Sequence, residues 1–212
     1  MSDSHSHHCG DWEERYSSVG RLWSGQPNEW LPPMAAGWSP GAALDIGCGE
    51  GADALWLAER GWQVTGIDLS ATAVGRLRME ADRRGLGACV TALVQDGVAG
   101  LDRGTFDLVT SFYVHGGPDE GDRSLGELLA DAAAHLAPGG RLLVVVHAAN
   151  PPWRAHRART YTAAEILEEI GPAVADWEVV AAEERWREAT GPQGQAGRYA
   201  DAILCLRRPG TT

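Results

Sequence analysis

Lysine is missing from this chain of 212 residues, and all 18 of its basic residues are arginine. This absence excludes lysine Schiff-base chemistry and the phosphate-binding lysine of P-loop proteins. Positive charge is also scarce, because 29 acidic residues outnumber the 18 arginines and leave a formal net charge of -11. Nucleic-acid binding depends on neutralising phosphates with basic side chains, so we expect no nucleic-acid partner.

Long hydrophobic runs are missing as well. A run such as Leu142–Val146 is far shorter than the roughly 18 to 20 residues of a membrane span, and the polar, His-rich start does not resemble a signal sequence. We therefore expect no membrane association and a cytoplasmic location. The four cysteines, Cys9, Cys48, Cys89 and Cys205, are scattered without a CxxC pair, which predicts reduced thiols rather than disulfides or a zinc site.

The length suits one compact domain. Residues 1–10, MSDSHSHHCG, are predicted to be a disordered tail, and residues 11–40 carry four tryptophans among Gly, Pro and Ser, which is typical of a lid. The tail residues His5, His7, His8 and Cys9 are possible metal ligands, but nothing fixes their geometry, so we predict no metal site. Residues 41–212 are predicted to form the domain itself.

Short apolar runs alternate with helical stretches from residue 42, which predicts βαβ units and a buried parallel sheet. The expected strands are 42–46, 63–68, 90–95, 106–111 and 141–147, and the expected helices are 52–60, 70–84 and 125–136. Thr162 and Glu165 form a capping box for a helix that reaches Ile170. Residues 177–187 and 199–207 read as a terminal antiparallel pair of strands.

A glycine-rich segment, LDIGCGEGA, lies between the first expected strand and the first expected helix. Its glycines permit a tight turn and close approach of a ligand to the backbone, and Asp68 ends the next strand, where a carboxylate can bind ribose hydroxyls. A nicotinamide dinucleotide and another adenosine cofactor both fit this pattern. Asp45 favours the second, because a carboxylate two residues before the first glycine suits a cationic amino-acid group and would repel a pyrophosphate.

The segment LDIGCGEGADALWLAERGWQVTGIDLS, followed by QDG, FDLVTS and LAPGGRLLVV, resembles the class I S-adenosylmethionine-dependent methyltransferases over about residues 40–147. The resemblance implies an α/β, Rossmann-like, doubly wound sheet of seven strands, mostly parallel with the last strand antiparallel. It also implies S-adenosyl-L-methionine as cofactor. Carried over by position, the expected cofactor-binding residues are Asp45, Gly47, Cys48, Gly49 and Gly51 for the methionine part, Asp68 and Leu69 for ribose and the adenine edge, Asp96 and Gly97 for the adenine amino group, and Ser111 and Phe112 beside the transferred methyl.

Within that superfamily, WEERYSSVGRLWSGQPNEW resembles the small tellurite-resistance and thiopurine type of enzyme, in which an N-terminal segment closes over the cofactor. This second resemblance implies a soft sulfur or chalcogen acceptor. The chain has Ser111-Phe112-Tyr113-Val114 where related enzymes carry the Asn/Asp-Pro-Pro-Tyr/Trp signature, which disfavours methylation of base or amide nitrogens.

Methyl transfer needs alignment and exclusion of water more than it needs a metal. A hydroxyl or thiol acceptor must lose a proton, and His115, Tyr113 and His147 follow core strands at the edge where ligands bind in open α/β sheets. A ready thiolate would need no base. For the acceptor pocket we expect Trp12, Tyr16, Trp23, Trp153 and Arg154.

The sequence thus predicts a methyltransferase that acts on a small-molecule S, O, N or chalcogen nucleophile. Two alternatives stay open at this point. One is an NAD-dependent oxidoreductase, and the other is a non-catalytic metal-handling protein that retains the cofactor pocket.

Overall fold

A single seven-stranded sheet organises the chain, in the strand order β3-β2-β1-β4-β5-β7-β6. The structure is a computed structural model that describes residues 12–102, 105–114, 124–154 and 159–211. The strands are β1 (Ala42–Ile46), β2 (Gln63–Asp68), β3 (Val90–Val94), β4 (Phe106–Phe112), β5 (Leu136–Ala149), β6 (Glu178–Thr190) and β7 (Ala196–Arg207).

The strand directions confirm the predicted topology. β1 pairs in parallel with β2 and β4, and β2 with β3 and β4 with β5 likewise, whereas β7 runs antiparallel to both β5 and β6. A dinucleotide-binding sheet has six parallel strands in the order 3-2-1-4-5-6. The antiparallel β7 inserted beside β5 therefore disfavours the NAD-dependent alternative.

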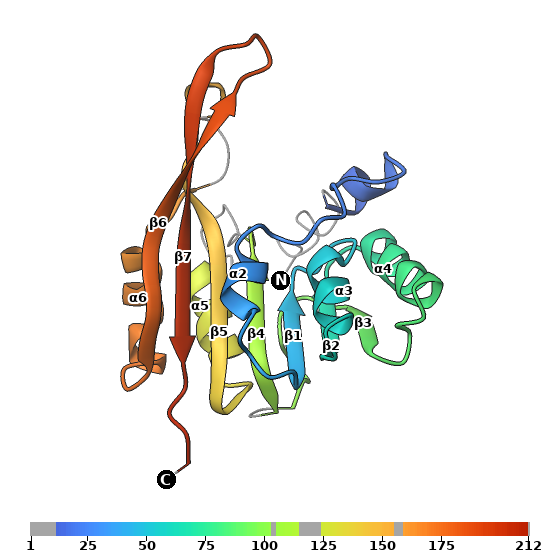
Figure 1. The fold of residues 1–212 in the computed structure, drawn as a ribbon, viewed down its shortest axis with the longest axis vertical. Coiled ribbons are helices and arrows are strands. Elements are labelled where there is room, and N and C mark those ends of the chain that lie inside the picture. The colour runs from blue at the N-terminus through green and yellow to red at the C-terminus, as the bar shows by residue number, and fades with distance from the viewer. Residues whose placement is uncertain (1–11, 103–104, 115–123, 155–158, 212) are drawn as a thin grey trace, which may run out of the picture.

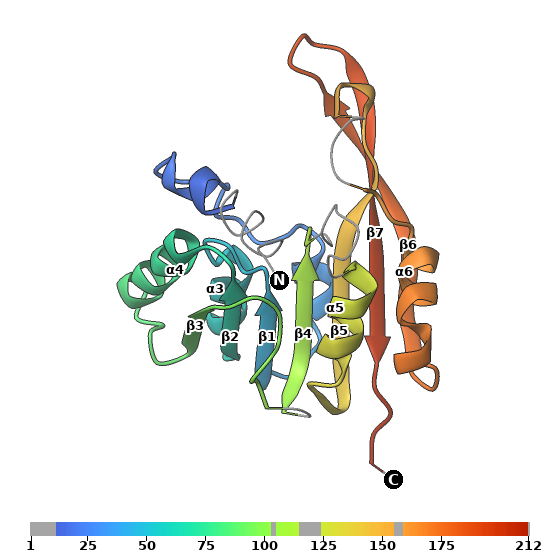
Figure 2. The same cartoon turned by 180° about the vertical axis from the view of Figure 1, so that it is seen from behind.

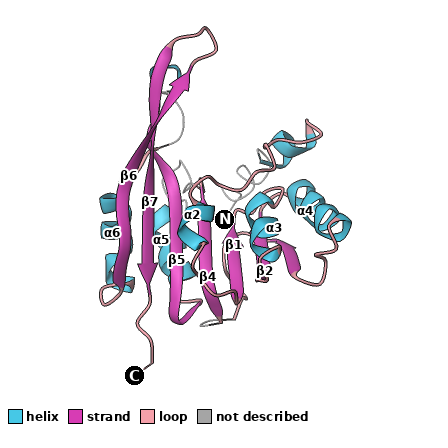
Figure 3. Cartoon of the chain, viewed as in Figure 1, coloured by secondary structure: helices cyan, strands magenta, loops and turns pink. Residues whose placement is uncertain are grey.

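Helices cover both faces of the sheet (Figures 1 and 2), and Figure 3 shows the strands as one layer between them. The elements are α2 (Leu31–Ala35), α3 (Ala52–Ala58), α4 (Ala71–Arg83), α5 (Leu125–Ala133) and α6 (Ala163–Ile170), with 3-10 turns η1 (Pro152–Arg154) and η2 (Gly171–Ala173). Residues 12–17 form a further helical turn. One core lies between the sheet and α2, α3 and α4, and a second lies between the sheet and α5 and α6. None of the described helices is long and apolar enough to cross a membrane.

Local sequence signals explain where the helices begin. The Ser70 side chain accepts a hydrogen bond from Ala73 N and so caps α4. Ser124 and Thr162 each form a complete capping box, with Glu127 and Glu165 respectively, which confirms the helix start expected at Thr162.

Four elements, α5, β5, β6 and β7, have bounds that differ from the sequence prediction. The helix expected to reach residue 136 ends at Ala133, and β5 begins at Leu136, because Leu136 pairs with Phe106 of β4 before a register shift admits the Pro-Gly-Gly turn. The terminal strands are also longer than expected, and their ends project beyond the rest of the sheet as a twisted hairpin (Figure 1).

Candidate functional site

The glycine-rich loop lies at the carboxyl end of β1 and leads into α3. Gly47, Gly49 and Gly51 all have positive φ values of 68°, 51° and 84°. A Cβ on Gly49 would lie 2.7 Å from the Tyr16 hydroxyl, and a Cβ on Gly51 would lie 2.1 Å from Leu77 Cδ1. These two positions accept only glycine, both for conformation and for space.

Two buried polar atoms beside this loop have no hydrogen-bond partner among the described residues. They are Asp45 Oδ2 on β1 and Ser111 Oγ on β4. The other carboxylate oxygen of Asp45, Oδ1, accepts a hydrogen bond of 2.7 Å from the Thr110 hydroxyl. Buried polar groups in native proteins are almost always satisfied, so an unpaired carboxylate oxygen and an unpaired hydroxyl on neighbouring strands indicate a ligand site.

Asp68 at the end of β2 holds the glycine-rich loop in place. Its Oδ2 accepts from Gly49 N at 2.8 Å, and its Oδ1 accepts from Ser70 N at 2.9 Å. A carboxylate has about four acceptor positions, so it can still receive ligand hydroxyls after these two bonds. Burial raises the pKa of Asp68 despite the hydrogen bonds, which oppose the shift.

The pKa values of two neighbouring carboxyl groups, Asp45 and Asp53, are also raised. Burial, and then the nearby charge of Asp53, raise the pKa of Asp45 well above its usual value. Burial also raises the pKa of Asp53, to about 6. A cationic ligand between these carboxylates would offset their repulsion and desolvation.

The remaining residues expected at the cofactor lie around this loop. Cys48 is buried, and burial raises the pKa of its thiol well above the usual value, which suits packing rather than nucleophilic attack. Leu69 and Phe112 are half-buried, Asp96 is exposed, and Gly97 has a φ of 70° and accepts a hydrogen bond from the Gln95 amide through its carbonyl.

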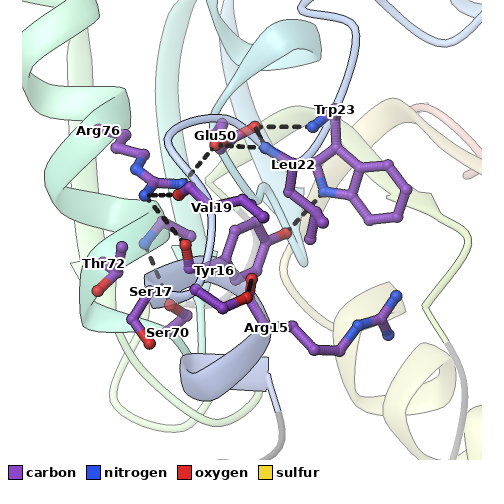
Figure 4. Close-up of polar contacts among 12 residues, drawn as sticks. Arg15, Tyr16, Ser17, Val19, Leu22, Trp23, Glu50, Ser70, Thr72 and Arg76 are labelled. Carbon is purple, nitrogen blue, oxygen red and sulfur yellow. Dashed lines mark hydrogen bonds and ion pairs between the residues drawn. The ribbon is translucent and has the colours of Figure 1, made fainter.

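The N-terminal segment, residues 12–35, crosses the carboxyl edge of the sheet (Figures 1 and 2), and we call it the strap. Figure 4 shows the contacts between the strap and the glycine-rich loop. The buried Glu50 carboxylate accepts hydrogen bonds from Leu22 N and Trp23 N at 3.0 to 3.1 Å and from Arg76 Nη1 at 2.8 Å. Although burial opposes it, these donors hold the pKa of Glu50 below its usual value.

Two expected acceptor-pocket residues lie in the strap beside the loop. Tyr16 is buried, and its hydroxyl accepts a hydrogen bond of 2.9 Å from Trp23 Nε1. Trp23 itself is 49% exposed. Trp12 lies one helical turn from Tyr16, with ring centroids 6.0 Å apart, and Glu13 next to it fastens the start of the strap to Ser70 and Thr72 of α4.

A second cluster gathers at the ends of β4 and β5. Tyr113 has a φ of 55°, and its ring lies 4.4 Å from the His147 ring between centroids. Burial, and then the charge of Asp201, raise the pKa of Tyr113, so this phenol stays protonated at neutral pH and is a poor base. His115, the other expected base, lies outside the described residues, as does the His/Cys tail.

Trp153 and Arg154 lie in η1, directly after β5. A Cβ on Gly197 would lie 2.4 Å from the Trp153 ring, so Trp153 packs on the β6–β7 hairpin and not beside the glycine-rich loop. Arg154 is exposed, with its guanidinium carbon 5.6 Å from the centre of the Tyr199 ring. The structure thus separates the expected acceptor residues into a strap group and a hairpin group.

Comparisons with known proteins agree with this geometry. Residues 43–140, which carry the glycine-rich loop, Asp68 and Ser111, match the family described as "Methyltransferase domain". This part of the chain belongs to the class I S-adenosylmethionine-dependent methyltransferases. The chain is 38% identical over 136 residues to a 2-heptyl-1-hydroxyquinolin-4(1H)-one methyltransferase from Mycobacteroides abscessus, an alignment that covers 61% of this chain and 58% of that protein. Other relatives are named as ribosomal RNA and ubiquinone biosynthesis methyltransferases.

Solved structures share the fold of this chain at lower sequence identity. One, described as the conversion of a disulfide bond into a thioacetal group during echinomycin biosynthesis, is 22% identical with a TM-score of 0.73 and covers 97% of this chain and 94% of that one. TehB from Haemophilus influenzae is 18% identical with a TM-score of 0.66, covering 94% and 67%. The chain spans between 32% and 58% of the lengths of eight curated relatives.

Several residues of the candidate site are not evident from the sequence. Glu50 and Arg76 anchor the strap, Thr110 binds Asp45, and Asp201 on β7 binds His147. Their partners are distant in sequence, by 54 residues for His147 and Asp201. A buried Asp in the apolar run YADAILCL was the one available signal. Within the described residues, no group of three or more His, Cys, Asp or Glu side chains could hold a metal ion.

Proposed function

We propose that this chain transfers a methyl group from S-adenosyl-L-methionine to a small-molecule nucleophile. The observation that carries the proposal is the pair of unpartnered buried atoms, Asp45 Oδ2 and Ser111 Oγ, beside a loop of left-handed glycines. Asp45, Asp53 and Asp68 around them have raised pKa values, as expected for a site completed by a cationic ligand.

The cofactor site follows from these residues. Asp45 and the backbone of Gly47, Cys48, Gly49 and Gly51 would hold the methionine part, and Asp68 with Leu69 would hold the ribose and adenine edge. Asp96 and Gly97 would contact the adenine amino group, while Ser111 and Phe112 border the reacting centre. When bound there, S-adenosylmethionine supplies an electrophilic methyl group on a sulfonium sulfur.

The acceptor site lies where the strap passes the ends of β4 and β5. Tyr16 and Trp23 stand over the glycine-rich loop, Trp12 flanks them, and Tyr113, His147 and Arg154 with Trp153 lie on the side toward the hairpin. Aromatic surfaces on both sides favour a small, partly aromatic acceptor. The similarity to a hydroxyquinolinone methyltransferase supports the same class of acceptor.

Calorimetry with S-adenosylhomocysteine tests the proposal. We expect micromolar binding and no binding of NADH. Asp68→Ala should weaken S-adenosylhomocysteine binding by about 1.5–3 kcal/mol, since charge-assisted hydrogen bonds are lost and the glycine-rich loop loses an anchor. Glu168→Ala, which removes an exposed carboxylate from α6, is the matched control and should bind as the wild type does. Normal binding by Asp68→Ala would show that the cofactor site is wrongly placed.

A screen of thiols, phenols, amines and chalcogen oxyanions, read as S-adenosylhomocysteine release, identifies the acceptor. The soft sulfur or chalcogen acceptors of the tellurite-resistance and thiopurine type belong in the screen. Turnover of any member supports small-molecule methylation.

A further inference from the structure

Asp201 is a fully buried carboxylate on β7 that lies outside the predicted cofactor site. Its Oδ1 lies 3.1 Å from His147 Nδ1, and its Oδ2 accepts from Arg187 Nε at 3.0 Å and from Trp30 Nε1 at 3.3 Å. Burial, and then the charge of Asp201, raise the pKa of the Tyr113 phenol. Burial alone would raise the pKa of Asp201, but these donors hold it below the usual value, so the group is ionised at neutral pH.

An ionised carboxylate can only accept hydrogen bonds. The short contact with Asp201 therefore requires the proton of the neutral His147 ring to be on Nδ1, and the lone pair is then on Nε2. The imidazole is also held between two rings, because the Tyr113 and Tyr199 centroids lie 4.4 Å and 5.9 Å from it. One tautomer and one orientation are thus fixed by two residues of β7, Asp201 and Tyr199, and by Tyr113, which follows β4.

Among the described residues, charged groups from three elements lie near His147. Asp201 comes from β7, Arg187 comes from β6, and Glu29 comes from the strap, with its Oε1 3.2 Å from Arg187 Nε. Arg154 lies farther out, over the Tyr199 ring, and Tyr113 is neutral. About 22% of the His147 side chain is exposed, so the ring is within reach of a small molecule.

We propose that Asp201 is a positioning residue that sets His147 to take a proton from a neutral protic acceptor, a phenolic or heteroaromatic hydroxyl or a thiol. This inference rests on the proposed methyl transfer. The proton of the acceptor passes to His147 Nε2, and the electron pair left on the oxygen or sulfur forms the bond to the methyl carbon. The pair of the broken carbon–sulfur bond stays on the cofactor sulfur, and the imidazolium is stabilised by Asp201 until water removes its proton.

Nitrogen-15 NMR of the histidine rings tests the tautomer without any turnover. We expect the His147 signals, assigned by their loss in His147→Gln, to show a protonated Nδ1 and an unprotonated Nε2 in the neutral ring. Asp201→Asn should shift this ring toward the Nε2-protonated tautomer, because an amide can donate to Nδ1. Asp176→Asn, an exposed site near the end of α6, is the matched control and should leave the spectrum unchanged. A wild-type ring protonated on Nε2, or no change in Asp201→Asn, would overturn the proposal.

Kinetics with substituted phenols and thiophenols adds a second readout. For acceptors that are neutral at the assay pH, Asp201→Asn should lower kcat about 100-fold, with S-adenosylhomocysteine affinity within twofold of wild type. For a nitrothiophenol that is already ionised, the rates of the variant and the wild type should be equal, since no base is needed. An equal loss of kcat in Asp201→Asn on the neutral and the ionised acceptor would show that Asp201 has only a structural role.

The outcomes separate this inference from the methyl-transfer proposal. Absent S-adenosylhomocysteine binding in the wild type counts against methyl transfer itself, whereas intact binding with the wrong His147 tautomer counts only against Asp201. If Asp201→Asn does not fold, the wild-type spectrum still shows which nitrogen of His147 is protonated. The kinetics of His147→Gln then test whether His147 takes the proton of the acceptor. His147→Gln should also lower kcat about 100-fold on neutral acceptors and leave the ionised thiophenol unaffected.

Discussion

The carboxylates beside the glycine-rich loop reduce the stability of the fold when they are ionised and no ligand is bound. Asp45, Asp53 and Asp68 all have pKa values raised first by burial. Such a carboxyl binds protons more tightly in the folded state than in the unfolded state. Its contribution to stability is therefore present at low pH and is lost as the pH rises toward the folded-state pKa.

Asp53 offers a direct test of this cost. With a usual pKa of 3.8 and a folded-state pKa of about 6, it should destabilise the protein progressively between those values. Asp53→Asn keeps an oxygen that can accept the 2.6 Å hydrogen bond from Asn28 N but carries no charge. We expect this variant to exceed the wild type in free energy of unfolding by about 1–3 kcal/mol at pH 7, and to gain little at pH 4. Urea unfolding at pH 4, 5, 6 and 7 measures the difference.

Saturating S-adenosylmethionine should reduce the difference in free energy of unfolding between Asp53→Asn and the wild type. Its positive charge would offset the negative charge of Asp53 in the wild type. Glu168→Ala again provides the control, since its exposed carboxylate should add no pH dependence of this kind. A difference between Asp53→Asn and wild type that stays constant with pH would contradict the assignment.

At the scale of elements, the buried Glu50 carboxylate holds the middle of the strap against the glycine-rich loop. Glu50 receives two backbone N–H groups of the strap and the guanidinium of Arg76, which itself donates to the carbonyls of Tyr16 and Val19. Hydrogen bonds to a charged group contribute more than neutral ones, roughly 1.5–3 kcal/mol each. Loss of Glu50 also leaves Arg76 without its partner.

The rate of trypsin cleavage after Arg21 measures how firmly Glu50 holds the strap. The chain has no lysine, and the exposed Arg21 directly precedes Leu22 in the strap. We expect Glu50→Ala to speed cleavage after Arg21 by about 30-fold or more, equivalent to roughly 2 kcal/mol of local opening. Glu14→Ala, an exposed change in the same segment, should cleave at the wild-type rate. Unchanged cleavage in Glu50→Ala would mean that other contacts hold the strap.

Much of the sheet was predictable because local signals and long-range packing agree. Strands β1 and β2 have the expected bounds, and their apolar runs are buried under helices on both faces. The end of α5 was misplaced because Leu136 is as suitable for a helix as for a strand, and pairing with Phe106 decides between them.

The acceptor side was less predictable, for a physical reason. The glycine-rich loop is a local motif, whereas the Asp201 cluster joins the strap, β4, β5, β6 and β7 through tertiary contacts. The position of Asp201 opposite His147 depends on the antiparallel register of β5 and β7, which no local pattern reveals. The packing of Trp153 against Gly197 is likewise a tertiary contact that no local pattern reveals.

For the molecule as a whole, the net negative charge favours a small acceptor over a nucleic acid. With a net charge of -11, the protein should repel a polyanion, even though some relatives are named for ribosomal RNA methylation. We expect no shift of a labelled RNA hairpin by micromolar protein at about 150 mM salt. Binding that weakens steeply with added salt would contradict this expectation and would favour a nucleic-acid acceptor.

The strap is fastened to Glu50 beside the glycine-rich loop and, through Trp30, to Asp201 beside His147. A single stretch of backbone thus forms a border of both proposed pockets. If filling one pocket reorders this stretch, the free energy of filling the other must change, and linkage requires the two effects to be equal in size. The order in which cofactor and acceptor arrive, and in which their products depart, would then be governed by the strap, residues 12–35, which carries out no chemistry.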